Sequence, residues 1–220
     1  MPMSCHCPQP MHSVRRQAVG RTSLSTKALS TAFAAMFIAW SATILSKLSL
    51  VGRDGELTSG QAIAVVGAGL VAGFTTAFAS SIWFSAVEGE VYAMSTFFTC
   101  LTLWATLKWY QLPNDADSDR WLVFAFFASA LSIGVHLLSI LTFPALAMFY
   151  YFKKAKKHSI TGTLVAAFVG VLFIVGIQYF IIAGIPRFWA YFDKLFVNSF
   201  GLPFYSGIVA VFLIFGGVIW

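Results

Sequence analysis

The chain has 220 residues, of which 59% are hydrophobic, 17% aromatic and only 10% charged, and its mean hydropathy is +0.81. Soluble domains carry about 25% charged residues, so this composition indicates an integral membrane protein. The formal net charge of +6 comes from lysines and arginines that cluster at the ends of apolar runs, where such residues set topology. We therefore expect membrane lipids, and no nucleic acid, as partners.

The first part of the chain alternates a polar start with apolar runs. Residues 1–27 are polar and are expected to lack regular structure. Three runs long enough to cross a ~30 Å hydrocarbon core as helices follow, at residues 28–48, 60–84 and 91–109. Near the end of the third run, Trp104, Trp109 and Tyr110 are expected to form an interfacial aromatic belt.

The second run contains a glycine pattern that invites two interpretations. Residues 63–73 imitate a dinucleotide-binding fingerprint, which requires a strand, a turn and a helix with a polar face. An apolar run contains no such strand, turn and polar helix face, so dinucleotide binding is not predicted. Gly69 and Gly73, four positions apart, are instead predicted to let a neighbouring helix approach closely.

Residues 121–152 contain no Asp, Glu, Lys or Arg. As one straight helix this segment would be about 48 Å long, well beyond the thickness of the hydrocarbon core. It is therefore predicted to break near residues 132–136 into two segments that cross the membrane twice, with Pro144 kinking the second.

The basic cluster at residues 153–158 directly follows this segment and is predicted to face the cytoplasm. A further span is expected at residues 160–185, and residues 186–196 form an amphipathic, aromatic stretch suited to a membrane interface. After a loop at 198–207, residues 208–220 begin another span. The prediction is an all-α, polytopic transmembrane bundle of about six to seven membrane segments that occupies residues 28–220.

Two carboxylates, Glu88 and Glu90, lie between the second and third runs. Ionisable groups at membrane depth mark functional sites, although a water-exposed turn would explain the same pair. Glu90 leads directly into the third run and is the better candidate for a buried carboxylate. His136 is the one histidine of the uncharged segment, and it is either functional or hydrogen-bonded to a neighbour. The double crossing places Glu88, Glu90, His136 and residues 186–206 on the extracytoplasmic face.

Four separated motifs carry a family resemblance. They are Phe84-Ser-Ala-Val-Glu-Gly-Glu-Val-Tyr-Ala-Met94, Leu131-Ser-Ile-Gly-Val-His-Leu-Leu138, Tyr150-Tyr-Phe-Lys-Lys154 and Phe196-Val-Asn-Ser-Phe-Gly-Leu-Pro-Phe204. From about Ser23 onward, the chain resembles the bacterial branch of the domain-of-unknown-function 2723 family. That family is similar to membrane glycosyltransferases of the GT-C type, and its animal relative is a protein O-mannosyltransferase. The acidic residue of the family motif corresponds to Glu90, and the histidine of the family corresponds to His136.

The resemblance has limits at both ends of the chain. Family members begin with a further transmembrane helix and an outer loop that bears the expected catalytic base, and residues 1–22 do not match that region. Members also continue far beyond residue 220. The resemblance therefore implies a fragment truncated at both ends, which is expected to be inactive alone.

The function implied by the resemblance is sugar transfer at the extracytoplasmic face, in a bacterial inner membrane with the site toward the periplasm. The implied partners are a polyprenyl-phosphate sugar and the Ser or Thr hydroxyl of a secreted protein. On this hypothesis, Glu90 and Glu88 have catalytic roles. The residues that contact the donor phosphate are His136, Arg187 and Lys194. No cofactor is indicated, and a divalent-metal requirement stays open. The alternative is a non-enzymatic transporter or assembly scaffold, in which Glu90 and His136 relay protons or hold helices together.

Overall fold

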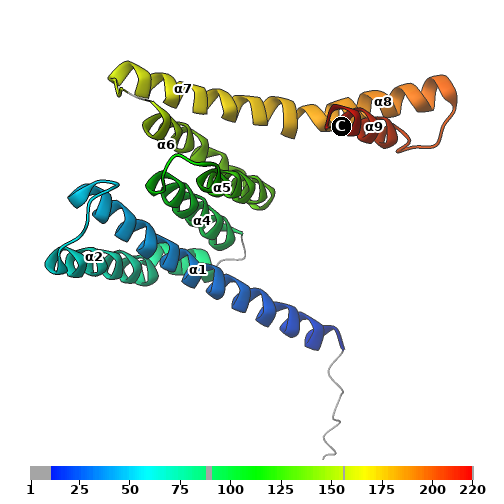
Figure 1. The fold of residues 1–220 in the computed structure, drawn as a ribbon. Helices are drawn as coiled ribbons and strands as arrows, with labels where there is room; N and C mark the ends of the chain where they lie inside the picture. Colours follow the sequence, from blue (N-terminus) through cyan, green and yellow to red (C-terminus); the bar gives the residue numbers. More distant parts are fainter. Residues whose placement is uncertain (1–10, 88–90, 156, 220) are drawn as a thin grey trace, which may run out of the picture. The chain divides into compact units, whose positions relative to one another are not determined.

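In the computed structural model, which describes residues 11–87, 91–155 and 157–219, every regular element is a helix (Figure 1). The elements are α1 (Met11–Val51), α2 (Ser59–Phe78), α3 (Ser80–Val87), α4 (Tyr92–Gln111), α5 (Ala116–Val135), η1 (Leu137–Thr142), α6 (Phe143–Lys154), α7 (Ile160–Gly176), η2 (Ile177–Ile182), α8 (Gly184–Phe200) and α9 (Gly207–Ile219). The predicted all-α class is confirmed for this part of the chain.

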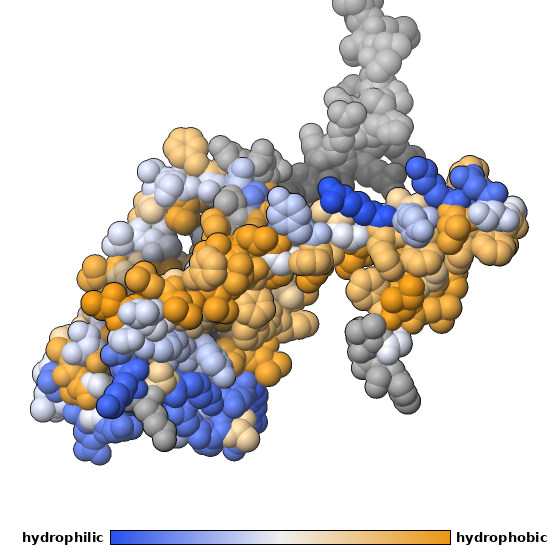
Figure 2. All heavy atoms as spheres, turned by 90° about the horizontal axis from the view of Figure 1, so that it is seen from above, coloured by the Kyte–Doolittle hydropathy of each residue, from blue (hydrophilic) through white to orange (hydrophobic). Residues whose placement is uncertain are grey.

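Within the described residues, four helical stretches are long and apolar enough to cross a membrane. They are Ser25–Val51, Ser59–Phe78, Ala116–Val135 and Ile160–Phe200. Helix α4 has 20 residues but is not among them, because its serine, threonines, lysine and glutamine lower its hydropathy. Hydrophobic side chains cover most of the visible surface, and hydrophilic ones gather at its margins (Figure 2).

The chain divides into two compact units. The first unit comprises Met1–Thr142 with Phe149–Lys157, and the second comprises Phe143–Met148 with His158–Trp220. Helix α1 of the first unit begins at Met11, directly after Pro10, whereas the sequence predicted no regular structure before residue 28. No proline follows Pro10 within α1, so nothing in the backbone interrupts the helix where the chain is still polar.

Helices α1 and α2 run side by side with a close crossing at the predicted glycines (Figure 1). A Cβ on Gly73 would lie 3.0 Å from the Cβ of Ala39, and one on Gly69 would lie 3.0 Å from the Ala39 carbonyl oxygen. The two glycines therefore face small residues of α1 with no space for a side chain. The prediction that Gly69 and Gly73 admit a neighbouring helix is confirmed.

The second predicted span, residues 60–84, is divided in the structure. Helix α2 starts with a capping box at Thr58 and Gln61 and ends at Phe78, and Ala79 has an extended backbone before α3 begins. The hydroxyl of Thr76 donates to the carbonyl of Ala72, 2.8 Å away. The Thr- and Ser-rich sequence around this point offers local hydrogen bonds that compete with a continuous helix.

The uncharged segment 121–152 breaks where the sequence predicted. Helix α5 ends at Val135, His136 has an extended backbone, and the 3₁₀ helix η1 follows. The chain then returns, because the ammonium of Lys153 near the end of α6 donates to the Ser118 hydroxyl near the start of α5, at 3.2 Å. Pro144 does not kink the second segment: it lies in the first turn of α6, where its missing N–H costs no hydrogen bond.

The end of α4 is completed by side chains from other helices. The carbonyl of Trp109 has no donor four residues on, because Pro113 lacks an N–H. The Lys153 ammonium donates to this carbonyl and lies 4.3 Å from the centre of the Trp109 ring. Arg53 donates to the carbonyl of Leu112 at 2.8 Å. Two cations therefore stabilise the negative end of one helix dipole.

Trp109 itself is not part of an interfacial belt, contrary to the sequence prediction. It is fully buried, and its indole N–H donates to the carboxylate of Asp119 at 3.0 Å. The ring is covered by Lys153 on one side and stacks on Tyr150, with 5.9 Å between ring centres. The position of Trp109 near the end of an apolar run predicted an interfacial residue, but α6 packs over it and buries it.

The second unit is built on helical turns that continue from Ile160 to Phe200 with a π-helical interruption at η2. Near its start, Gly170 lies so close to Pro144 that a Cβ would be 2.8 Å from the proline nitrogen. Helix α8 ends at Phe200, and the next residue, Gly201, adopts the left-handed conformation with φ of 63°. Helix α9 then packs against α8, and its first N–H, from Gly207, donates to Asp193 at 3.1 Å.

Candidate functional site

The predicted carboxylates Glu88 and Glu90 lie outside the described residues. Their neighbour Tyr92, the last residue of the Glu-Val-Tyr motif, begins α4. Its ring lies 5.0 Å from the imidazole of His136, measured between ring centres. Tyr92 and the predicted histidine therefore meet at one end of the first unit.

His136 is held at the turn between α5 and η1. Its backbone N–H donates to the Ser132 carbonyl at 2.8 Å, and its own carbonyl accepts from the Ser139 N–H at 3.2 Å. The side chain is half-buried. These contacts fix the backbone of His136 on both sides, so that the imidazole stays beside Tyr92.

A network of buried hydroxyls, which the sequence analysis missed, supports this turn. The hydroxyls of Ser95 and Ser139 are 3.1 Å apart, and Ser132 donates to Ser139 at 2.5 Å. All three side chains are at most 8% exposed. Hydroxyl pairs of this kind join helices in an apolar environment. The network ties the start of α4, the end of α5 and η1 together around His136.

A second set of hydroxyls continues the network deeper between the helices. Ser129 of α5 lies 3.5 Å from the Thr102 hydroxyl of α4 and 3.3 Å from that of Thr142. The signal in the sequence was the recurrence of Ser and Thr on otherwise apolar helices. Such residues usually bond back to their own helix, so the pattern alone does not reveal contacts between helices.

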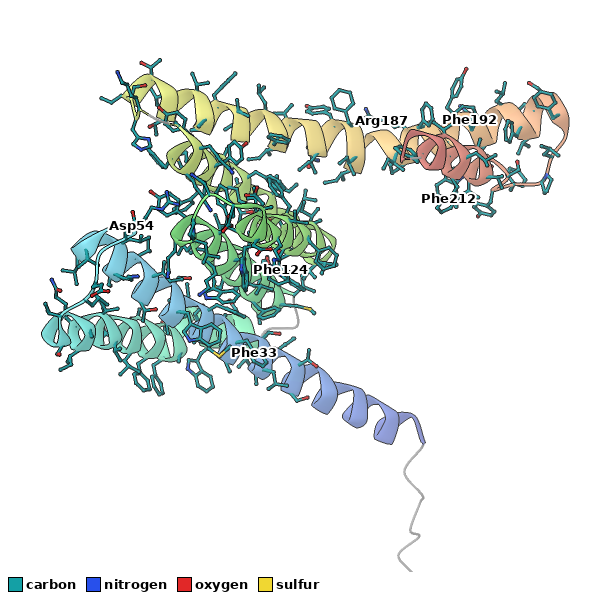
Figure 3. The ribbon with its side chains drawn as sticks, viewed as in Figure 1. Phe33, Asp54, Phe124, Arg187, Phe192 and Phe212 are labelled. Atoms are coloured by element: carbon teal, nitrogen blue, oxygen red, sulfur yellow. The ribbon has the colours of Figure 1, made fainter. Side chains whose placement is uncertain are left out.

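The two cations predicted to contact phosphate, Arg187 and Lys194, belong to α8 in the second unit. Figure 3 labels Arg187 on this helix. They are seven positions apart in the sequence, so both lie on one face of the helix, about 10 Å apart along its axis. Both side chains are exposed. The opposite side of α8 carries a ladder of aromatic rings, with 4.9 Å between the centres of Phe188 and Phe192 and 6.0 Å between those of Phe192 and Phe196. This division between polar and aromatic faces is the amphipathic pattern the sequence predicted.

In the described part of the chain, no three His, Cys, Asp or Glu side chains gather closely enough to hold a metal ion. The first unit has two distinct ends. Tyr92 and His136 lie at one end of α4, whereas Trp109, Asp119 and Lys153 lie at the other. A helix of 20 residues is about 30 Å long, so these two ends are well separated. The candidate site is therefore at the end of the unit away from the lysine cluster.

Apolar helices of membrane-spanning length, exposed hydrophobic faces and buried hydroxyl pairs define an integral membrane protein with an all-helical architecture. The chain belongs to the family described as the protein O-mannosyl-transferase TMEM260 N-terminal domain, whose model matches residues 16–159. The match includes Glu88, Glu90 and His136 and leaves out Arg187 and Lys194. No curated protein and no solved structure matches the chain significantly.

The matched segment refines the resemblance drawn from the motifs. Residues 16–22, which the sequence analysis placed outside the resemblance, lie within the match. Residues 160–220, including the motif at 196–204, lie beyond it. Membership of the family therefore rests on α1 to α6, the elements that form the His136 end and the Lys153 end.

Proposed function

We propose that this chain is part of a GT-C-type membrane glycosyltransferase, embedded by about six to seven segments in a bacterial inner membrane. It transfers a sugar from a polyprenyl-phosphate donor to a Ser or Thr hydroxyl of a secreted protein on the periplasmic side. Family membership supports the class of reaction. The observation that carries the assignment of the site is the contact between Tyr92 and His136, which joins the two family motifs.

The transfer makes one bond and breaks one. The acceptor hydroxyl oxygen attacks the anomeric carbon of the sugar and loses its proton to a base. The bond between that carbon and the phosphate oxygen breaks, and the lipid phosphate leaves with the electron pair. A carboxylate is needed near the hydroxyl, and hydrogen-bond donors or cations are needed near the phosphate.

The residues of this chain fit these roles by type and position. Glu90 precedes Tyr92 by two residues, so chain geometry alone keeps the two Cα atoms within about 7 Å of each other. We assign to Glu90 the task of orienting or assisting the base, with Glu88 as a second carboxylate two residues earlier in the chain. His136 contacts the donor phosphate. Arg187 and Lys194 add positive charge at the membrane face.

The test uses the full-length protein in liposomes with a labelled polyprenyl-phosphate sugar and a secreted acceptor protein. The name of the family makes mannose the first sugar to supply. Glu90→Gln removes the carboxylate with little change of shape and is expected to lower transfer by about 10²-fold or more. Glu56→Gln makes the same change at an exposed loop beside Arg53, at the Lys153 end, and is the matched control.

Three results would separate the alternatives. Loss of transfer in Glu90→Gln but not in Glu56→Gln supports the assignment. Full transfer by Glu90→Gln removes Glu90 from the mechanism. Absence of transfer by the unmodified protein, together with proton-coupled uptake of a solute, would identify a transporter instead.

A further inference from the structure

An aromatic groove runs along the first unit between α1, α4 and α5. Its volume is about 680 Å³, and its walls include Phe33, Phe37, Trp40, Trp104, Trp121 and Phe124. Phe33 and Phe124 are labelled on α1 and α5 in Figure 3. Both of these helices have stretches apolar enough to span the membrane, so the groove faces lipid chains.

The groove has a polar mouth. Arg120 lines it beside Trp121 at the start of α5 and is hydrogen-bonded to the Asp117 carboxylate at 2.7 Å. The Arg120 side chain is 71% exposed and that of Asp117 is 84% exposed. An exposed ion pair is weak, so either partner exchanges readily for a stronger one. One cation and one anion thus stand side by side where the apolar walls end.

The groove is also limited in depth. On α4 its lining extends from Phe97 to Trp104, seven residues or about 10 Å, which is less than half of a ~30 Å hydrocarbon core. Arg120 lies next to Asp119, at the Lys153 end of the unit and away from His136. The groove therefore lies within one leaflet, and its mouth is at the opposite end from the proposed sugar-transfer site.

We propose that this groove binds one phospholipid with a zwitterionic headgroup that carries a primary ammonium. One acyl chain lies between the aromatic walls, the phosphate binds Arg120, and the ammonium binds Asp117. The paired opposite charges at the mouth match the phosphate and ammonium of such a headgroup. A purely anionic headgroup would meet Asp117 as a repulsive neighbour, and a quaternary ammonium has no N–H to donate to it. The proposal is independent of the proposed sugar transfer.

The tryptophans of the groove report directly on its occupant, because bromine on a lipid chain quenches indole fluorescence at short range. The full-length protein is reconstituted in phosphatidylcholine vesicles with increasing amounts of chain-brominated phosphatidylethanolamine, phosphatidylcholine or phosphatidylglycerol. We expect phosphatidylethanolamine to quench with an apparent association constant about two- to fivefold above that of phosphatidylcholine, since exposed charge pairs are weak.

Two variants and a reporter control localise the effect. Arg120→Gln is expected to abolish the preference, whereas Lys157→Gln removes an exposed cation from the lysine cluster that follows α6 and should preserve it. Replacement of Trp40, Trp104 and Trp121 together by Phe keeps the aromatic walls and should remove the preferential part of the quenching.

Several outcomes would overturn the proposal. Equal quenching by all three lipids indicates ordinary annular lipid, and a preference for phosphatidylglycerol indicates an anion site. Weak quenching by every lipid indicates that a protein segment or a second copy covers the groove. If the lipid preference persists in Arg120→Gln, the lipid binds elsewhere. The same conclusion follows if the preference persists after the groove tryptophans are replaced.

Discussion

Replacement of Lys153 by methionine tests how α4 is terminated. The Lys153 side chain is 4% exposed, and its ammonium donates to the Trp109 carbonyl and to the Ser118 hydroxyl. Lys153→Met preserves the length of the side chain but leaves that carbonyl without a donor, which costs about 1–3 kcal/mol. Loss of the cation over the Trp109 ring costs up to about 2 kcal/mol more where the pair is desolvated.

One term opposes these losses, because the variant no longer buries a cation. We expect a net destabilisation of about 2–4 kcal/mol. For a chain of this size, that corresponds to a fall in Tm of about 4–16 °C by the scaling known for globular proteins. Thermal unfolding of the purified protein in detergent, followed by intrinsic fluorescence, measures the change.

Lys154→Met is the matched control for this experiment. Lys154 follows Lys153 directly, and its ammonium lies 3.5 Å from the Asp119 carboxylate in a partly exposed ion pair. Pairs of this kind contribute about 0–1 kcal/mol, so the control should unfold close to the unmodified protein. Equal stability of the two variants would show that the buried ammonium does not hold the end of α4.

Three further predictions concern other contacts. Gly69→Leu forces a side chain into α1 and should destabilise the protein by about 1–3 kcal/mol in the same unfolding assay, whereas Gly67→Leu enters open space and should not. Ser139→Ala breaks two buried hydroxyl pairs and should cost about 1 kcal/mol; no change in its Tm would mean that the network is not stabilising. Asp193→Ala removes the acceptor for the first N–H of α9, and hydrogen exchange at Gly207 should speed up about fivefold, a change that an unaltered rate would contradict.

The architecture was predictable where one physical constraint dominated. A segment of 32 uncharged residues, 121–152, is too long for one crossing, and the structure breaks it at His136. Gly69 and Gly73 have no side chains, which allows a neighbouring helix to pack closely against α2, and α1 packs there. In both cases length or side-chain volume leaves few solutions, so the pattern in the sequence was sufficient.

Other features depended on contacts between distant residues and were not predictable. The sequence placed Trp109 at the membrane interface because its position in the run resembles a belt, but the return of α6 covers it with Lys153. Pro144 was expected to bend a helix and instead begins one. The hydroxyl network around Ser139 forms only because α4, α5 and η1 pack together, and no local sequence pattern predicts that packing.

The candidate site was also predictable only in part. His136 was identified because it is the one histidine of a segment without Asp, Glu, Lys or Arg, and the structure places its ring beside Tyr92, a contact that the sequence did not predict. The roles of Glu88 and Glu90 stay predictions that the transfer assay tests. Arg187 and Lys194 were chosen for their charge beside an amphipathic stretch, and in the structure both belong to the amphipathic helix α8, while their contact with phosphate stays a prediction.

The termination of α4 has a consequence for biosynthesis. The carbonyl of Trp109 is completed by a residue 44 positions later in the chain. Until Lys153 has been synthesised, the carbonyl of Trp109 at the end of α4 has no ammonium to accept from. Completion of α4 is therefore coupled to the synthesis and folding of α5 and α6, and a translational pause between residues 113 and 153 would prolong the exposure of that acceptor.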